Sequence, residues 1–551
     1  MKKVFLILLF LVVVPCVMAQ SNNKNDFKLG KALEIFANLM SQTSVMYVDS
    51  IDPEGMIKRA ADAMFDGLDP YTEYLPESKM DDFEFSTTGK YGGVGALIRQ
   101  NGPWVEILEP YLNTPADKAG LKAGDRILAI DGVSMKSMGA PKVSATLKGN
   151  AGDKLTVLIA PISDTNTTRE VVLVRERITL PSVPYFGVLK DKIGYIMLTS
   201  FTDNCASEVR HALLELIEKY KIEGLVLDLR GNGGGVVGQS ISIAGLFLPH
   251  GTEVVSLRGR TPQSNTIYKT TGSPLAPNLP LAVLVNSSSA SASEILAGAI
   301  QDLDRGVILG QRSFGKGLVQ GTHTVGYGAF LKVTTARYYT PSGRSIQALD
   351  YTHRREDGSV GTVPDSLITE FKTTNGRKVY NGGGVNPDVK LEAQYLSKFT
   401  AILLGFGFID SFANEYAAIH PADSNFKVDG VLYNDFKNYM KDKTIKYRSQ
   451  SDITLEKLRQ MAVLEKYSDR ITVELDAIAA KIKEDKDAEL NISSDDIKRA
   501  LTDAILQRWF YLGGRIQHSL LSDAEATRAA ELLNNKTEYE RILKEQDTTK
   551  N

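Results

Sequence analysis

The sequence is poor in the residues that usually bind metals or form disulfides. It contains two cysteines and six histidines in 551 residues. Two cysteines cannot form a disulfide framework, and Cys16 and Cys205 lie too far apart for a zinc-finger spacing. No two histidines have the His-Glu-x-x-His spacing of a zinc peptidase. We therefore expect no metal site, and we expect no cofactor.

The sequence also lacks an excess of charge of either sign. Its 64 Lys and Arg residues are balanced by 66 Asp and Glu residues, which gives a formal net charge of -2. A protein that binds nucleic acid or anionic membranes usually carries a basic field, so neither partner is expected. At roughly 100 to 200 residues per domain, the length predicts three or four domains.

The first 19 residues have the pattern of a secretory signal peptide. Two lysines precede an apolar run at residues 4–14, and small residues follow up to Ala19. An uncleaved membrane anchor is the alternative, but the run is shorter than the ~20 residues that a spanning helix needs. We expect export across the inner membrane to the periplasm, with no membrane span after the signal is removed.

The spacing of apolar residues divides the rest of the chain into four regions that differ in predicted secondary structure. Apolar residues recur at helical spacing around residues 29–40 and 54–65, whereas the polar segment from there to Thr88 is predicted to be a loop. The predicted domains are a signal peptide (1–19), a helical N-terminal region (20–88), a β-rich domain (89–178), an α/β core (179–395) and a helical C-terminal region (396–551).

The α/β core is predicted from alternating strands and helices. Apolar runs at residues 225–227 and 281–285 lack in/out alternation, which is typical of parallel strands covered on both faces. The C-terminal region carries an amphipathic repeat at Ile497, Leu501 and Ile505. Such a face either packs on the core or supports oligomerisation, and we expect oligomerisation.

Residues 113–132, NTPADKAGLKAGDRILAIDG, predict a short helix, a turn and a strand in the β-rich region. This segment closely resembles a PDZ domain. In PDZ domains a glycine-rich loop binds the terminal carboxylate of a peptide through backbone N–H groups. Here Gly93, Val94 and Gly95 stand where that loop is expected. The alternative is that these glycines only make a turn.

Three segments of the α/β core carry candidate chemistry. The first, residues 227–235 (LDLRGNGGG), runs from a strand into a glycine-rich loop that can present N–H groups to an oxyanion. By itself it is equally consistent with a phosphate-binding loop or a crossover turn. It lacks the Gly-Lys-Ser/Thr ending of a Walker loop, which disfavours nucleotide binding.

The second segment places Ser291 at the predicted start of a helix. Ser291 and Glu294 form a Ser-x-x-Glu capping box, so Ser291 has a purely structural explanation as an N-cap. The same position puts a hydroxyl at the positive end of a helix, beside the free N–H of Ala292, which suits a nucleophile and its oxyanion hole. The local pattern does not separate the two interpretations.

The third segment, residues 310–320, contains Lys316 between two glycines, 25 positions after Ser291. Burial lowers the pKa of a lysine, and a neutral lysine can take a proton from serine. Gln320 is placed to orient that amine. A lone lysine is more often a solvated surface charge, and only its combination with the other segments favours the catalytic interpretation.

Two of these motifs, SASASEILAGAIQD at residues 289–302 and SFGKGLVQ at 313–320, resemble those of the carboxyl-terminal processing (tail-specific) proteases. These are secreted Ser/Lys peptidases with a PDZ domain. The resemblance extends over about residues 25–395 and includes LDPYTEYL at 68–75, ARYYTPSGRSIQ at 336–347 and GVNPDV at 384–389. It implies a multidomain α/β fold, with a crotonase-like protease core and an inserted PDZ domain.

The resemblance also implies roles for individual residues. Ser291 would be the nucleophile, Lys316 the general base and Gln320 the residue that holds the lysine. The N–H groups of Ala292 and of a glycine at 233–235, for which we choose Gly234, would form the oxyanion hole. Asp302 matches an acidic position of the family, and packing at the helix end explains it equally well.

Several alternatives compete with this reading. The rival nucleophiles are the neighbouring serines Ser287, Ser288, Ser289 and Ser293. A Ser/His/Asp triad is a further alternative, and it would use His323. A catalytically latent PDZ scaffold and an acyl-CoA enzyme on a crotonase-like core are rival functions. The preferred hypothesis is an endopeptidase whose partners are proteins with exposed C-terminal tails, with a homodimer formed through the helical terminal regions.

Overall fold

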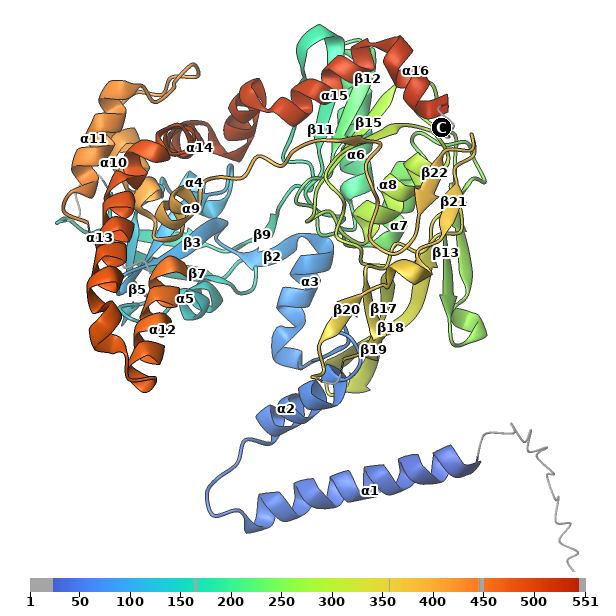
Figure 1. Cartoon of the computed structure of the whole chain (residues 1–551), viewed down its shortest axis with the longest axis horizontal. Helices are drawn as coiled ribbons and strands as arrows, with labels where there is room; N and C mark the ends of the chain where they lie inside the picture. Colours follow the sequence, from blue (N-terminus) through green and yellow to red (C-terminus); the bar gives the residue numbers. More distant parts are fainter. Residues whose placement is uncertain (1–22, 163–165, 356, 444, 446–449, 545–551) are drawn as a thin grey trace, which may run out of the picture.

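The computed structural model describes residues 23–162, 166–355, 357–443, 445 and 450–544. The predicted signal peptide lies outside these residues. Figure 1 shows the β-rich domain and most C-terminal helices on one side and the α/β core on the other, while the first helix extends away from both. None of the described helices is both long and apolar enough to cross a membrane.

A six-stranded sheet forms the centre of the core, and its strand order is β10-β11-β12-β15-β16-β23. All neighbours pair in parallel except β10 and β11, which confirms the predicted parallel sheet with helical crossovers. The strands are β10 (Tyr185–Val188), β11 (Ile193–Met197), β12 (Gly224–Asp228), β15 (Leu281–Val285), β16 (Val307–Gly310) and β23 (Val389–Lys390).

Both faces of this sheet are covered. Leu227 and Val283 pack on one face with residues of α6 (Cys205–Glu218), α7 (Val237–Ala244) and α8 (Ala292–Asp302). Val226 and Leu284 point to the other face, where α15 (Ala524–Asn534) packs. The C-terminal region therefore completes the hydrophobic core around the central sheet, which explains why these strands lack alternation.

A second, antiparallel sheet lies beside the core. Its strands are β1 (Glu73–Leu75), β13 (Glu253–Gly259), β14 (Thr266–Lys269), β17 (Leu318–Gly326) and β18 (Ala329–Tyr339). Strand β18 pairs with β1, β13 and β17, and Glu73 stands opposite Lys332. The N-terminal region thus contributes a strand to the sheet that contains β17, the strand that follows Lys316, and β18 lies between the two. Short strands complete the core: β19 (Leu349–Arg354), β20 (Val360–Thr362), β21 (Glu370–Lys372) and β22 (Lys378–Tyr380).

The β-rich domain is inserted into the chain through an antiparallel pair, β2 (Lys90–Gly93) and β9 (Glu176–Thr179). Its sheet has the order β3-β4-β5-β7-β8, and the side chains facing α5 form a separate hydrophobic core. Its elements are β3 (Ala96–Asn101), β4 (Trp104–Pro110), α4 (Pro115–Lys118), β5 (Arg126–Ile130), β6 (Val133–Ser134), α5 (Ala140–Leu147), β7 (Lys154–Ala160) and β8 (Arg169–Val174). The short helix and the strand predicted within residues 113–132 are present as α4 and β5, and the region is rich in strands as predicted.

The C-terminal helices hold the β-rich domain. Asp410 accepts hydrogen bonds from Arg99 of β3 and Arg508 of α14, and Gln507 donates to the buried Glu109 of β4. These helices are α9 (Lys398–Gly405), α10 (Phe408–Ile419), α11 (Gly430–Met440), α12 (Gln450–Leu464), α13 (Ser468–Ile492), α14 (Ser494–Ser519), α15 and α16 (Lys536–Lys544).

The amphipathic repeat of the C-terminal region packs within the chain. Ile497, Leu501 and Ile505 are fully buried in α14, in one cluster with side chains of α9, α10 and α11. This face is therefore not available for a second subunit. Most large apolar side chains of α1 (Asn23–Met46), in contrast, are exposed, among them Phe27 and Leu33.

The N-terminal region contains one helix that the sequence analysis did not predict. Helix α2 (Pro53–Asp66) follows the expected periodicity, but α3 (Met80–Thr88) lies where a loop was expected, and that prediction was wrong. Asp81 and Asp82 occupy the first turn of α3, and Gly89 ends it in the left-handed conformation. These end signals were present, but the segment is too polar to show an apolar stripe.

Candidate active site

Ser291 lies at the turn between β15 and α8, as the N-cap residue of the helix. Its backbone has a φ of 58° and a ψ of -113°, a conformation that costs about 1–3 kcal/mol for a residue other than glycine. Strained backbone of this kind persists only where the surrounding structure enforces it. Ala292 is the first helical residue, so its N–H has no acceptor within the helix and lies beside the Ser291 hydroxyl.

The glycine-rich loop after β12 is fastened to the Ser291 turn. The carbonyl oxygen of Asn232 accepts hydrogen bonds from the Ala290 N–H and from Ser293 Oγ. Gly234 approaches so closely that a Cβ atom there would lie 2.8 Å from the Cβ of Ser291, which only glycine avoids. The structure thus brings Gly234 to Ser291, although its N–H donates to Asn232 Oδ1 at 2.9 Å.

Lys316 lies in the segment between β16 and β17, and its side chain is largely buried. Burial lowers the pKa of its amine, and the nearby charge of Lys332 adds to this effect. The amine Nζ lies 4.3 Å from the ring centre of Tyr71. Among the described residues Lys316 Nζ has no hydrogen bond to Ser291 or Gln320, and the Gln320 amide donates to Thr334 Oγ1 at 3.1 Å instead. The role of Gln320 stays a prediction.

Glu294 joins the segments of Ser291 and Lys316. Its carboxylate accepts hydrogen bonds from the backbone N–H of Ser291 and of Lys316, both at 2.9 Å. The Gly315 N–H and Ser313 Oγ also donate to it, both at 2.6 Å. Glu294 is almost completely buried, and burial raises its pKa to about 7 in spite of these donors. One carboxylate thus fixes two backbone segments that lie 25 positions apart.

The rival serines and His323 are either hydrogen-bonded to other parts of the chain or exposed to solvent. Ser289 Oγ donates to the carbonyl oxygen of Leu229, and Ser293 Oγ is bonded to the glycine-rich loop. Ser287 and Ser288 are exposed in the turn. His323 is exposed on β17, seven positions after Lys316 in the sequence. These contacts leave Ser291 as the serine that faces both the glycine-rich loop and the Glu294 network.

Asp302 lies at the opposite end of α8 from Ser291. Its Oδ1 lies 2.8 Å from Nη2 of Arg344, and both side chains are almost completely excluded from solvent. Its Oδ2 accepts the N–H of Ser342 at 3.0 Å. The contacts therefore support helix-end packing, the second of the two explanations that the sequence offered.

The predicted PDZ loop leads into an edge strand. Gly95 has a φ of 77°, and its carbonyl oxygen accepts the N–H of Tyr111 and Oγ1 of Thr114. The carbonyl oxygen of Val94 accepts the N–H of Ala116, and Gly93 pairs with Glu176 of β9. Within the described residues β3 pairs with β4 alone, and α5 contacts β3 from the same domain. The other edge of β3 has no strand partner among the described residues, and it is at such an edge that a PDZ domain adds a peptide strand.

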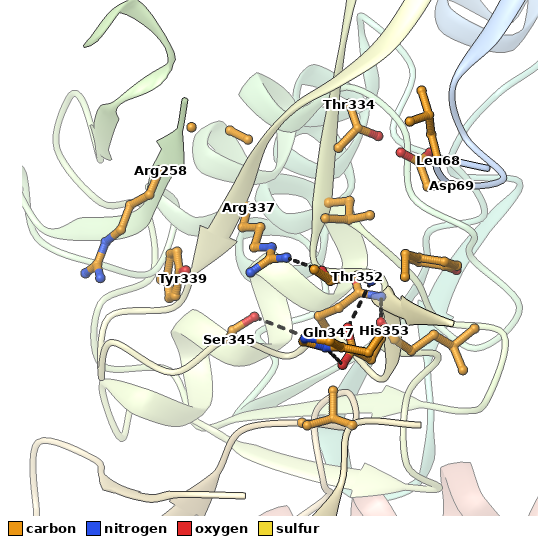
Figure 2. A pocket seen from close by; sticks show the side chains of 18 of the residues that line it. Leu68, Asp69, Arg258, Thr334, Arg337, Tyr339, Ser345, Gln347, Thr352 and His353 are labelled. Carbon is orange, nitrogen blue, oxygen red and sulfur yellow. Dashed lines mark hydrogen bonds and ion pairs between the residues drawn. The ribbon is translucent and has the colours of Figure 1, made fainter. Parts of the chain in front are cut away.

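A pocket of about 850 Å³ opens on the second sheet, and Figure 2 shows Arg337 reaching toward Thr352 inside it. Arg337 and Tyr339 flank Tyr338 along β18, so they point to the opposite face of the strand. Tyr338 faces the candidate dyad of Ser291 and Lys316, since its hydroxyl donates a hydrogen bond to the carbonyl oxygen of Ser291 at 3.3 Å. The arginine-lined face of this pocket is therefore turned away from Ser291.

The sequence analysis missed two contacts of the candidate site. Glu294 was noted as a capping residue, but its bond to the Lys316 N–H depends on the path of the chain between them. Tyr71 lies in a motif that the resemblance included, yet nothing local indicates that its ring lies against Lys316. The spacing of Ser291 and Glu294 was the only signal for the first contact.

Comparison with known proteins assigns three parts of the chain to families. Residues 192–368 match peptidase family S41, residues 106–161 match the PDZ domain, and residues 399–533 match the C-terminal helical domain of PDZ-proteases. The carboxy-terminal-processing protease of Bartonella bacilliformis is 36% identical over 347 residues, which cover 62% of this chain and 79% of that protein.

One more relative and one solved structure have similar names. The carboxyl-terminal-processing protease of Synechocystis sp. is 36% identical over 319 residues, which cover 56% of this chain and 70% of that protein. Among solved structures, the photosystem II D1 C-terminal processing protease is 31% identical; the match covers 64% of this chain and 86% of that one, with a TM-score of 0.35.

Proposed function

The chain belongs to the carboxyl-terminal processing proteases, which are serine peptidases, and we propose that it is an endopeptidase that uses Ser291 as nucleophile and Lys316 as general base. One observation carries this assignment: the buried carboxylate of Glu294 holds the backbone N–H of both residues. The predicted multidomain α/β fold with a PDZ domain is confirmed.

In the proposed reaction, Lys316 Nζ first comes within hydrogen-bond distance of Ser291 Oγ and keeps its contact with the face of Tyr71. Because burial lowers its pKa, the amine is neutral at a lower pH than a solvated lysine and takes the proton of Ser291 Oγ. The oxygen then attacks the scissile carbonyl carbon. The N–H groups of Ala292 and Gly234 stabilise the oxyanion, once the Gly234 N–H leaves Asn232. The amine leaves with a proton, and water releases the acyl group.

We further propose that the PDZ domain selects the substrate. A C-terminal tail adds as a strand to β3, and N–H groups of Val94 and Gly95 bind its terminal carboxylate. Such recognition needs no basic field, in keeping with the net charge of -2. We also propose that tail binding moves residues 92–175 and aligns Lys316 with Ser291. In support, Lys316 Nζ lies against the Tyr71 ring and makes no hydrogen bond to Ser291 among the described residues.

Two proposals concern the surroundings of the enzyme. We propose secretion across the inner membrane to the periplasm, from the signal pattern in residues 1–19.

We also propose a homodimer formed through α1, because its large apolar side chains, such as Phe27, Leu33 and Phe36, are exposed in the single chain. Sedimentation of a Leu33→Asp variant tests the dimer: we expect it to be a monomer, and an unchanged mass would contradict this.

Digestion of casein and of a protein with a disordered C-terminal tail tests the catalytic proposal. We expect Ser291→Ala and Lys316→Ala each to lower the rate by more than about 1,000-fold, as removal of a nucleophile or its base does in other serine peptidases. Ser287→Ala and Lys192→Ala, which change exposed residues, serve as matched controls. Full activity of either dyad variant would contradict the assignment. No cleavage by the unchanged protein would favour a latent scaffold.

A further inference from the structure

Tyr71 places an aromatic ring against the amine of the proposed base. Lys316 Nζ lies 4.3 Å from the centre of its ring, within the distance of a cation–π contact. The described carboxylates form no ion pair with this amine. The charged groups that face it are Asp69 before β1, Glu73 on β1, Lys332 on β18 and Glu294 on α8. Tyr71 therefore makes the direct contact with the amine.

The position of Tyr71 is fixed by the turn that carries it. Asp69 Oδ1 accepts the N–H of Tyr71 and of Thr72, both at 2.9 Å. The ring of Tyr71 meets Tyr351 edge to face, with 6.1 Å between the centroids. Directly after this turn, β1 pairs with β18, and Figure 2 shows Asp69 near Thr334 of that strand. The N-terminal region thus presents one aromatic face to Lys316.

We propose that Tyr71 is a positioning residue that stabilises the ammonium form of Lys316 during catalysis. This inference rests on the proposed function. As the Oγ–carbon bond to the substrate forms, the proton of Ser291 moves to Lys316 Nζ, and a positive charge appears in a largely buried place. Without an ion-pair partner, that charge is stabilised by the electron-rich face of the Tyr71 ring. The proton then passes to the leaving amine.

The sign of the effect on the pH profile follows from the contact. An aromatic face favours the charged lysine, so the ring raises the pKa of Lys316 above the value that burial alone would set. Loss of the ring lowers this pKa further, which moves the midpoint of the pH–rate profile to lower pH. It also makes the amine a weaker base, so the rate on the alkaline plateau falls.

Replacement of Tyr71 separates this role from a merely structural one. In Tyr71→Leu we expect the alkaline plateau of kcat to fall about tenfold, KM to stay within about twofold, and the midpoint to move down by about half to one pH unit. Tyr71→Phe keeps the ring face, so its plateau and midpoint should match the unchanged enzyme. Tyr327→Leu, at a fully exposed tyrosine, is the matched control.

A graded series protects the test against misfolding of the leucine variant. Phenylalanine carrying one, two or three fluorine atoms, incorporated at position 71, keeps the ring shape and weakens its electron-rich face stepwise. We expect kcat and the profile midpoint to fall with each fluorine. Constant values across the series, or a leucine variant with an unchanged midpoint, would overturn the proposal. If Lys316→Ala is inactive in the same assay, such a result refutes the role of Tyr71 and leaves the dyad intact.

Discussion

The two ends of helix α8 each carry a buried carboxylate, but the two carboxylates have different partners. At the C-terminal end, Asp302 contacts the guanidinium of Arg344. At the N-terminal end, Glu294 accepts four hydrogen bonds from neutral donors and has no cationic partner among the described residues. The helix itself is buried along its whole length, so both ends lie in the protein interior.

This difference separates a contact that only holds the structure from one that joins the two segments of the proposed dyad. A carboxylate paired with a guanidinium is compensated in charge and holds the loop at Ser342 in place. A carboxylate with neutral donors keeps its charge uncompensated, which is why burial raises the pKa of Glu294 to about 7. Its donors come from the segments of Ser291 and Lys316, so the state of Glu294 bears directly on the proposed dyad.

The largest expected effect concerns stability at the Asp302 end. Asp302→Asn leaves Arg344 charged and buried without its partner, and we expect the free energy of unfolding to fall by about 3–5 kcal/mol. The enzyme that remains folded should cleave with nearly unchanged kcat. Urea unfolding and active-site titration measure both quantities. The double variant Asp302→Asn/Arg344→Met should regain part of the stability, and a selective loss of kcat would instead assign chemistry to this end.

The second prediction concerns pH and the Glu294 end. Since its pKa is raised from 4.5 to about 7 by folding, the folded state binds the proton more tightly than the unfolded chain. The stabilisation is therefore complete below pH 4.5 and is lost as pH rises through about 7, a change of about 3 kcal/mol. Subtraction of the Glu294→Gln unfolding curve from that of the unchanged protein isolates this dependence. A flat difference would refute it.

The third prediction concerns activity at the Glu294 end. In Glu294→Gln the amide group presents N–H donors to backbone N–H groups, so the segments of Ser291 and Lys316 lose part of their common anchor. We expect kcat to fall about 100-fold, equal to about 2.7 kcal/mol, with a smaller loss of stability than at the Asp302 end. Steady-state kinetics test this, with Glu215→Gln as the surface control. An unchanged kcat would show that the Glu294 end of α8 contributes no more to activity than the Asp302 end.

The smallest expected effect comes from a change remote from both ends of α8. In Gly95→Ala the new Cβ would lie 2.3 Å from Thr114, at a φ of 77°, which distorts the proposed carboxylate loop. We expect KM for a substrate with a long tail to rise about tenfold, or about 1.4 kcal/mol, while cleavage of a short peptide is unchanged. Gly102→Ala in the same domain, where the Cβ meets nothing within 4 Å, is the matched control.

Elements with strong local signals were predicted well. The apolar run at residues 281–285 has the bounds of β15, the run at 225–227 lies within β12, and the capping box places the start of α8 at Ser291. The helix α3 was missed because its polar sequence has no apolar stripe. The amphipathic face of α14 was expected to bind a second subunit, but it is buried against α10 of the same chain. Periodicity shows that one face of a helix is covered, but it does not show which part of the protein, or which partner, covers it.

The sequence by itself determined the order of the regions, the parallel sheet and the motifs around Ser291 and Lys316, because periodicity, caps and short spacings act over a few residues. The tertiary structure alone decided that Glu294 binds both segments, that Tyr71 lies on Lys316 and that α15 completes the catalytic core. These contacts join residues that are 22, 245 and about 300 positions apart. Such pairs meet only through the packing of the whole fold, which no local pattern records.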